Sequence, residues 1–420
     1  MNPVSSLIFK WYLFLTFLAI FSSTTVDFIS VFSGLILAWF VFTVFFIGAN
    51  KTISLSNKAL TSISTRSNLG DCKLYSLPII SFFSVISSFY AAYFYTGKTF
   101  LEVFSALALN VSLYNEYQKY FASQGLGTFS LIKIPAILSM LYLKVSVVYS
   151  FLSIFVLTRK VKVINIFWIL IIAFSSLYFS LSRGTSFEFF ELLLLLWFCL
   201  SMRTIRYNHR NSVFSRKNIV MAVIGFAALT LYSYNISARY SFRDVSTCIT
   251  LEMCLDDETL LYFVSSPIAE LTLKLSGYFT FGIYYTSVFL NDFWLSSFKQ
   301  FMILLFPFAS FYDDTVSIKM LCDVTIDCGA AWIPDIVIYI INAGFILIFL
   351  ASYLVGRFIR GITFVAFSES DVIIYAILYL AFLSLVSLPV GNFLTISSAN
   401  VLLLVLVSTV YFFRKVMKNS

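Results

Sequence analysis

Long unbroken apolar runs constrain this chain more than any other feature of its sequence. A bilayer-spanning helix needs roughly 20 mainly apolar residues, because hydrocarbon satisfies no backbone polar group and only helices or closed barrels avoid that cost. The runs are continuous and lack the roughly ten-residue alternation of a barrel strand. With 60% hydrophobic and 11% charged residues, the chain is predicted to be an all-α integral membrane protein.

Ten spanning helices are predicted, within a single polytopic membrane domain at residues 1–420. They cover residues 7–23, 28–48, 76–95, 129–157, 163–181, 185–202, 218–237, 333–355, 371–388 and 393–413. Short loops rich in Lys and Arg stay cytoplasmic, and here these residues gather in alternate loops. The basic loops are residues 51–73, 159–162, 203–217, 357–360 and 414–418. Both termini are therefore predicted to lie inside.

The net charge of +8 follows from this loop bias and from attraction to anionic lipid headgroups. Membrane lipids are therefore predicted partners, and no nucleic-acid partner is predicted. The first apolar run has no basic segment before it and no convincing cleavage site after it, so it is interpreted as a retained helix.

One long segment, residues 238–332, interrupts the even rhythm of the spans and falls outside by their parity. It contains two apolar pieces, residues 277–290 and 301–311, each too short to span comfortably. These pieces can be re-entrant, can lie in the membrane interface, or can form two short spans. The last alternative gives a range of 10–12 transmembrane helices with the same orientation.

Four of the six cysteines lie in this outer segment, in two pairs with the same spacing: Cys248 with Cys254, and Cys322 with Cys328. This pattern in a compartment predicted to be oxidising indicates disulfides, with three connectivities open. A metal site is the alternative. However, the chain's only histidine, His209, lies on the predicted cytoplasmic side, and neither pair has the close spacing of zinc ligands. No metal and no other cofactor is predicted.

Arg183, Glu188 and Glu191 stand in an otherwise apolar stretch, "FSSLYFSLSRGTSFEFFELLLLLWF". Charged groups in a span cost roughly 2.5 to 3.5 kcal/mol each on insertion scales, so they mark function by default. Arg183 is predicted at the outer N-terminus of the sixth helix, where backbone N–H groups and the helix dipole favour phosphate. The alternative is an arginine that reaches to lipid headgroups.

Glu188 and Glu191 share one helix face below Arg183 because they are three residues apart. Either carboxylate is a candidate catalytic base. The structural alternative is that Lys144, at a comparable depth on the fourth span, pairs with Glu191 and holds two helices together.

Further candidates lie in the outer segment. Arg239 and Arg243 are four apart, and two like charges on one helix face favour an anion between them. The segment "LTLKLSGYFTFGIYY" combines a cation, glycines and aromatic rings, which suits contact with sugar rings; a plain interfacial aromatic belt is the alternative. Its candidate substrate-binding residues are Lys274, Tyr278, Gly282 and Tyr285.

These features together resemble the Wzy family of O-antigen or capsule repeat-unit polymerases. The resemblance rests on a Ser-Arg-Gly at an outer helix mouth, a long outer loop that opens with arginines, and the Tyr-x-x-x-Gly of "GYFTFGIYY". It implies a metal-independent glycosyltransferase similar to the multi-spanning enzymes that use lipid-linked sugars. The implied reaction transfers a growing glycan from undecaprenyl pyrophosphate to the sugar of an incoming undecaprenyl-linked repeat unit, at the periplasmic face of the bacterial inner membrane.

The resemblance also implies roles for particular residues. Arg183 matches the arginine of the family's helix mouth, and Arg239 and Arg243 match the basic start of its large loop, so the three arginines would stabilise the pyrophosphate leaving group. A chain-length regulator is an implied partner. Phe281 is a departure, because many relatives have a histidine before the glycine.

Two other functions stay open at this point. An O-antigen ligase is the first, although such ligases rely on an outer-loop histidine that this chain lacks. A flippase or transporter of lipid-linked sugars is the second, although transporters commonly have internal repeats, and no convincing repeat is evident here.

Overall fold

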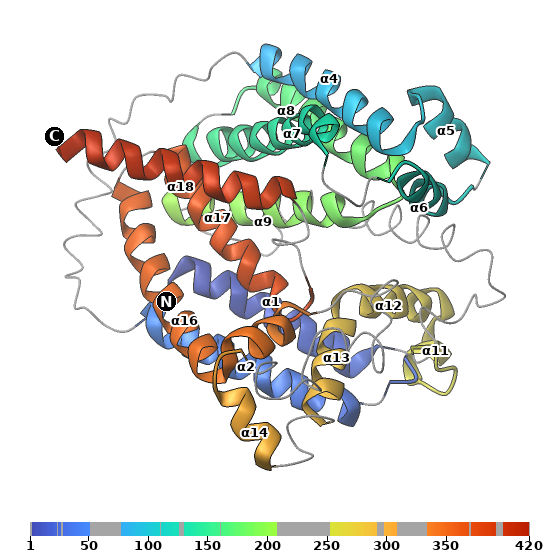
Figure 1. Ribbon diagram of the computed structural model, residues 1–420, viewed down its shortest axis with the longest axis vertical. Helices are drawn as coiled ribbons and strands as arrows, with labels where there is room; N and C mark the ends of the chain where they lie inside the picture. Colours follow the sequence, from blue (N-terminus) through green and yellow to red (C-terminus); the bar gives the residue numbers. More distant parts are fainter. Residues whose placement is uncertain are drawn as a thin grey trace. The chain divides into compact units, whose positions relative to one another are not determined.

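The computed structural model describes residues 2–22, 24–26, 28–50, 77–109, 111–125, 130–159, 161–207, 253–291, 298–308, 334–368, 371–391 and 398–419. Within these ranges the named elements are all helices, and the single β contact is a bridge between Thr24 and Leu255 (Figure 1). The predicted all-α class is confirmed for the described residues. The predicted span 218–237 lies outside them.

Six described helices are long and apolar enough to cross a membrane. They are α1 (Pro3–Phe21), α2 (Phe28–Asn50), α4 (Leu77–Thr96), η1 with α7 and η2 (Leu131–Leu157), α8 (Val163–Ser182) and α16 (Asp335–Ser368). Two further apolar helices, α17 (Val372–Ser387) and α18 (Ser398–Asn419), are shorter in their apolar part. Helix α9 (Phe187–Arg206) is not among the six, because it carries charged residues near both ends.

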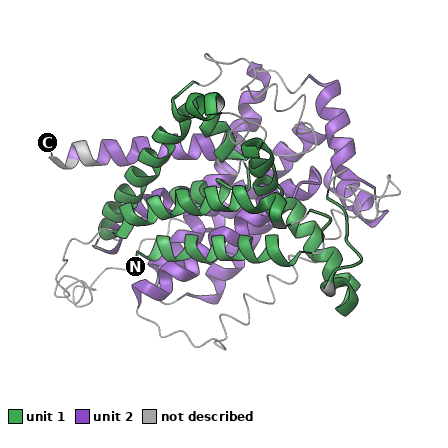
Figure 2. Ribbon diagram, turned by 90° about the horizontal axis from the view of Figure 1, so that it is seen from below, with its two compact units in different colours: residues 1–59, 247–365, 381–396 green, residues 60–246, 366–380, 397–420 purple. Residues whose placement is uncertain are grey.

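The chain divides into two compact units, which Figure 2 shows in different colours. Unit 1 comprises residues 1–59, 247–365 and 381–396. Besides α1, α2, most of α16 and the end of α17, its described residues form the shorter helices α11 (Leu260–Val264), α12 (Ser266–Phe279), α13 (Phe281–Phe289) and α14 (Phe298–Leu305). Figure 1 shows α13 turning away from α12, so the apolar piece 277–290 is not one continuous helix.

Unit 1 is built on close helix contacts at small residues. A Cβ added at Gly34 of α2 would lie 2.3 Å from the carbonyl oxygen of Ile283 in α13, and the Gly34 N–H donates to Ser287 Oγ at 2.7 Å. Gly48 of α2 and Gly356 of α16 pack in the same way against backbone. Without a hydrophobic drive between helices in lipid, close backbone approach of this kind supplies the packing.

Unit 2 comprises residues 60–246, 366–380 and 397–420. It contains α4, α5 (Phe100–Ala108), α6 (Leu113–Ser123), α7 (Ile134–Phe151) with its π-helical end η2 (Leu152–Leu157), α8, α9, α18 and the first part of α17. Helix α4 packs against both α7 and α8, and Ser88 of α4 donates to the carbonyl of Ser175 in α8 at 2.5 Å. Figure 1 shows α5 and α6 at the end of these helices opposite to the C-terminal end of α18.

Two arginines, Arg203 and Arg206, lie at the C-terminal end of α9. Arg203 donates to the carbonyls of Phe155, Thr158 and Arg159 at 3.1, 2.9 and 2.7 Å, which satisfies acceptors left over where the π-helix stops. Nearby, Arg206 donates to the Tyr375 hydroxyl at 2.8 Å. Arg183 lies at the other end of α8 and α9.

Candidate functional site

Arg183 sits in a tight turn between α8 and α9, and the predicted position needs a correction. It caps the C-terminus of α8 instead of beginning the next helix, which starts only at Phe187. Gly184 adopts a left-handed φ of 61°, its N–H donates to Leu181 O at 2.9 Å, and the Thr185 N–H donates to Ser180 O at 3.1 Å. This is the glycine-terminated Schellman cap. Arg183 therefore stabilises the negative end of a helix dipole, so the N-terminal anion argument does not apply to it.

The Arg183 guanidinium forms an ion pair with the Glu188 carboxylate, and this contact was not predicted from the sequence. The second carboxylate oxygen of Glu188 accepts from Thr185 Oγ1 at 3.2 Å. The guanidinium also donates to Phe179 O at 3.4 Å and stacks on the Phe179 ring, 4.1 Å from its centroid. The two charged side chains are 14% and 12% exposed. We call Arg183 and Glu188 the outer pair.

A second ion pair lies about one turn further along α9. Lys144 of α7 pairs with Glu191, and their side chains are 12% and 4% exposed. The Tyr379 hydroxyl of α17 donates to Glu191 at 3.4 Å, and Asn400 of α18 also hydrogen-bonds its carboxylate. This inner pair therefore joins side chains from four helices, and the structural alternative predicted for Lys144 and Glu191 is the contact observed.

A small cavity separates the outer pair from the inner pair. It is lined by Lys144, Glu188, Glu191 and Tyr379 together with apolar side chains of α7 and α9. Its empty space is about 220 Å³ including space open to solvent, but only about 10 Å³ admits the centre of a water molecule. That is room for about one water. The cavity is therefore too small for a sugar ring.

Helix α6 covers the Arg183 turn, and sequence reasoning missed it. A Cβ on Gly184 would lie 2.4 Å from the backbone nitrogen of Tyr114 in α6, so only glycine permits this approach. The Arg183 guanidinium lies 6.0 Å from the Tyr117 ring centroid. Burial raises the pKa of Tyr117, while the Arg183 charge acts against that rise.

Short helices of this kind leave capping signals but no apolar run. Ser112 accepts from the Asn115 N–H at the start of α6, at 3.4 Å. Glu102 accepts from the Thr99 N–H at 2.6 Å at the start of α5, and this bond lowers the pKa of Glu102. The Ser and Thr caps could have been found in the sequence.

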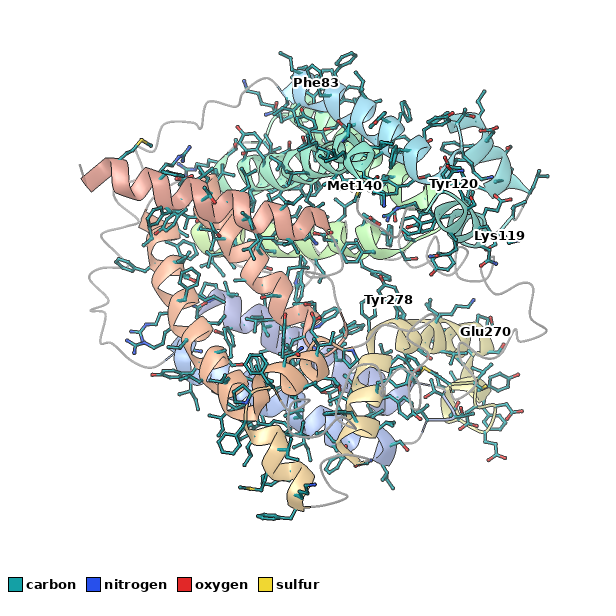
Figure 3. The ribbon with its side chains drawn as sticks, viewed as in Figure 1. Phe83, Lys119, Tyr120, Met140, Glu270 and Tyr278 are labelled. Atoms are coloured by element: carbon teal, nitrogen blue, oxygen red, sulfur yellow. The ribbon has the colours of Figure 1, made fainter. Side chains whose placement is uncertain are left out.

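The other predicted substrate-binding residues lie in unit 1. Tyr285 is 3% exposed and packs edge-on to Phe281, with ring centroids 4.2 Å apart. A Cβ on Gly282 would meet the Val390 carbonyl oxygen at 2.3 Å, so this glycine has a close-packing role. Lys274 is half-buried on α12. Burial lowers its pKa, and the charge of Glu270 partly offsets this effect. Glu270 and Tyr278, on the same helix, are labelled in Figure 3. Substrate contact by Lys274, Tyr278, Gly282 and Tyr285 stays a prediction.

Several predicted residues lie outside the described ranges: Arg239, Arg243, Cys248, Cys322 and Cys328. Cys254 is described and is disulfide-bonded. Its carbonyl accepts from the Thr25 N–H at 2.9 Å, and its own N–H donates to Thr25 Oγ1 at 3.0 Å. The disulfide-bonded residue is thus fixed to the turn that joins α1 and α2.

Comparison with known proteins adds no relative. No protein-family model matches the sequence, and no curated protein or solved structure shows significant similarity to it. Function must therefore be argued from the residues and their geometry.

Proposed function

We propose that the protein is a membrane glycosyltransferase of the O-antigen repeat-unit polymerase type. The observation that carries this proposal is the outer pair: a guanidinium held by Glu188 and the Phe179 ring, at the end of α9 opposite to Arg203 and Arg206. In the proposed reaction, a growing glycan leaves undecaprenyl pyrophosphate and joins the sugar of an incoming undecaprenyl-linked repeat unit. The reaction takes place at the periplasmic face of the inner membrane.

Arg183 would stabilise the leaving group. The bond between the sugar's anomeric carbon and the pyrophosphate oxygen breaks, and the electron pair stays on the pyrophosphate. A planar guanidinium placed at that oxygen neutralises the developing charge. Because Arg183 is already paired with Glu188, the pyrophosphate must replace the carboxylate as its partner.

Glu188 is the proposed base. Once displaced from Arg183 it can accept the proton of the acceptor hydroxyl as that oxygen bonds to the anomeric carbon. Thr185 holds the far carboxylate oxygen and limits how Glu188 can turn. The exchange of partners couples binding of the donor to release of the base. Glu191, whose carboxylate is committed to Lys144, Tyr379 and Asn400, is a positioning residue in this scheme.

The disulfide at Cys254 supports an outer location for its segment. Disulfides persist in oxidising compartments such as the periplasm, and the backbone bonds between Cys254 and Thr25 extend this assignment to the α1–α2 turn. Arg239 and Arg243 are proposed to add charge for the pyrophosphate, and a chain-length regulator is a proposed partner.

A deletion strain tests the proposal. Loss of a polymerase leaves single repeat units on the lipid carrier and on the final acceptor, whereas loss of a ligase or flippase leaves none on the acceptor. We expect single units in the deletion strain and long chains after complementation with the wild-type chain. A full-length ladder in the deletion strain would refute the proposed function, and absence of even single units would favour the ligase or flippase alternatives.

A further inference from the structure

Helix α6 carries an aromatic face that has no role in the proposed bond-breaking and proton-transfer steps. Tyr114, Tyr117 and Phe121 are three and four residues apart, so they share one face. Their ring centroids follow each other at 6.4 and 5.6 Å. All three rings are partly exposed, and Gln118 beside them is exposed. Figure 3 shows Lys119 and Tyr120 on the same helix.

This helix is held in place at two points that do not involve the aromatic face. Glu116 forms an ion pair with Lys98, in the turn between α4 and α5, at 2.5 Å. The Tyr120 ring covers Gly97, where an added Cβ would lie 2.7 Å from the ring. Tyr114 is pressed against Gly184 as well, so α6 is fixed over the Arg183 turn, and Tyr117 on its aromatic face lies 6.0 Å from the guanidinium.

The position of α6 determines how a substrate can reach Arg183. The cavity lined by Glu188 holds about one water, which leaves no room there for a sugar ring. An approach along α6 brings the ligand past Tyr117, whose ring centroid lies 6.0 Å from the Arg183 guanidinium. With the pyrophosphate on the guanidinium, the sugar attached to it must lie within reach of α6.

We propose that the aromatic face of α6 is a sugar subsite, with Tyr117 in contact with the sugar next to the pyrophosphate. The inference rests on the proposed function and names the residue that recognises the carbohydrate. Flat aromatic rings suit the apolar face of a sugar ring, and neighbouring amide and hydroxyl groups suit its hydroxyls. Gln118 and the Tyr117 hydroxyl supply such groups on this face.

Binding of two lipids, one with the sugar and one without it, distinguishes sugar recognition from pyrophosphate binding. The full-length purified protein in lipid nanodiscs is titrated with undecaprenyl pyrophosphate and with the single-unit lipid that accumulates in the deletion strain. Tyr117→Leu, which removes the flat ring, should weaken binding of the sugar-bearing lipid roughly tenfold and leave the sugar-free lipid unchanged. Tyr117→Phe should retain most of the affinity for both lipids.

Tyr93→Leu is the matched control, since it makes the same change at an exposed tyrosine of α4, away from the aromatic face. It should bind both lipids as the wild type does, and gel filtration checks that each variant is folded. An equal loss of both lipids in Tyr117→Leu would mean that Tyr117 only positions Arg183, and the subsite would be rejected. A selective loss in Tyr93→Leu would also overturn it. If the wild type bound neither lipid, the proposed function itself would fail.

Discussion

The outer and inner pairs have the same composition, one cation and one glutamate of α9, but different surroundings. The outer pair lies within one connection: Arg183 ends α8, Glu188 begins α9, and both keep some exposure. The inner pair joins α7 to α9, and Tyr379 and Asn400 occupy the other positions around Glu191. A carboxylate with several committed partners is suited to holding helices, whereas one with an exchangeable partner is suited to chemistry.

The largest expected effect is on the inner pair. Lys144→Met leaves Glu191 buried without its cation, and breaking such a pair costs about 3–5 kcal/mol. Thermal unfolding in detergent should show this loss. Lys144→Met combined with Glu191→Leu replaces both charges by apolar groups and should restore most of the stability. Equal instability of the single and double variants would mean that the pair is not what links these helices.

Arg183→Lys tests the outer pair with its charge conserved. Lysine can still pair with Glu188 but lacks the planar fork that fits a pyrophosphate. We expect a rate loss of about a hundredfold, or roughly 3 kcal/mol, with little change in thermal stability. Chain length on gels of the surface polysaccharide and rates with purified protein measure the effect. Wild-type chain length at a normal protein level would remove Arg183 from the active site.

Glu188→Gln distinguishes the two glutamates by kinetics. The amide cannot accept a proton, so kcat should fall by about a hundredfold or more, and KM should fall because the amide competes less strongly for Arg183. The matched change Glu191→Gln should leave kcat nearly intact. A larger loss of kcat in Glu191→Gln than in Glu188→Gln would reverse the assignment of the two residues.

The smallest expected effect concerns the turn that presents the outer pair. Gly184→Ala combines a left-handed φ, which costs a non-glycine residue about 1–2 kcal/mol, with a Cβ placed 2.4 Å from Tyr114. Gly125→Ala is the matched control, because its φ is 59° and no described atom lies within 4 Å of the added Cβ. Gly184→Ala should therefore lose more thermal stability than the control and also lose activity. An equal loss of stability in both variants would indicate that α6 moves to accommodate the added Cβ, and that the close contact at Gly184 does not fix its position.

The long helices could be predicted because a lipid bilayer restricts what can cross it. The sequence-predicted spans 28–48, 76–95 and 163–181 agree with α2, α4 and α8 within a few residues, because a bilayer demands long apolar helices wherever it is crossed. No such demand acts on α5 and α6, which are short and amphipathic. The π-helical end of α7 has no simple sequence signature.

The candidate site was predictable in part. The pairing of Lys144 with Glu191 could be anticipated, since both lie at similar depth and neither charge is tolerable alone in lipid. The partner of Arg183 could not, because it depends on where α8 stops. That point is set by Gly184 and its left-handed φ. The turn brings Arg183 into contact with Glu188 and places it 6.0 Å from the Tyr117 ring centroid. The glycine after a helical run was the available signal.

Two charge-free double variants, compared in the deletion strain, test the central claim most directly. One removes the inner pair, Lys144→Met with Glu191→Leu, and the other removes the outer pair, Arg183→Gln with Glu188→Gln. At matched protein levels, the first should restore long polysaccharide chains, and the second should give only single repeat units. Long chains from the variant without the outer pair would contradict the assignment of Arg183 and Glu188 as the reacting groups.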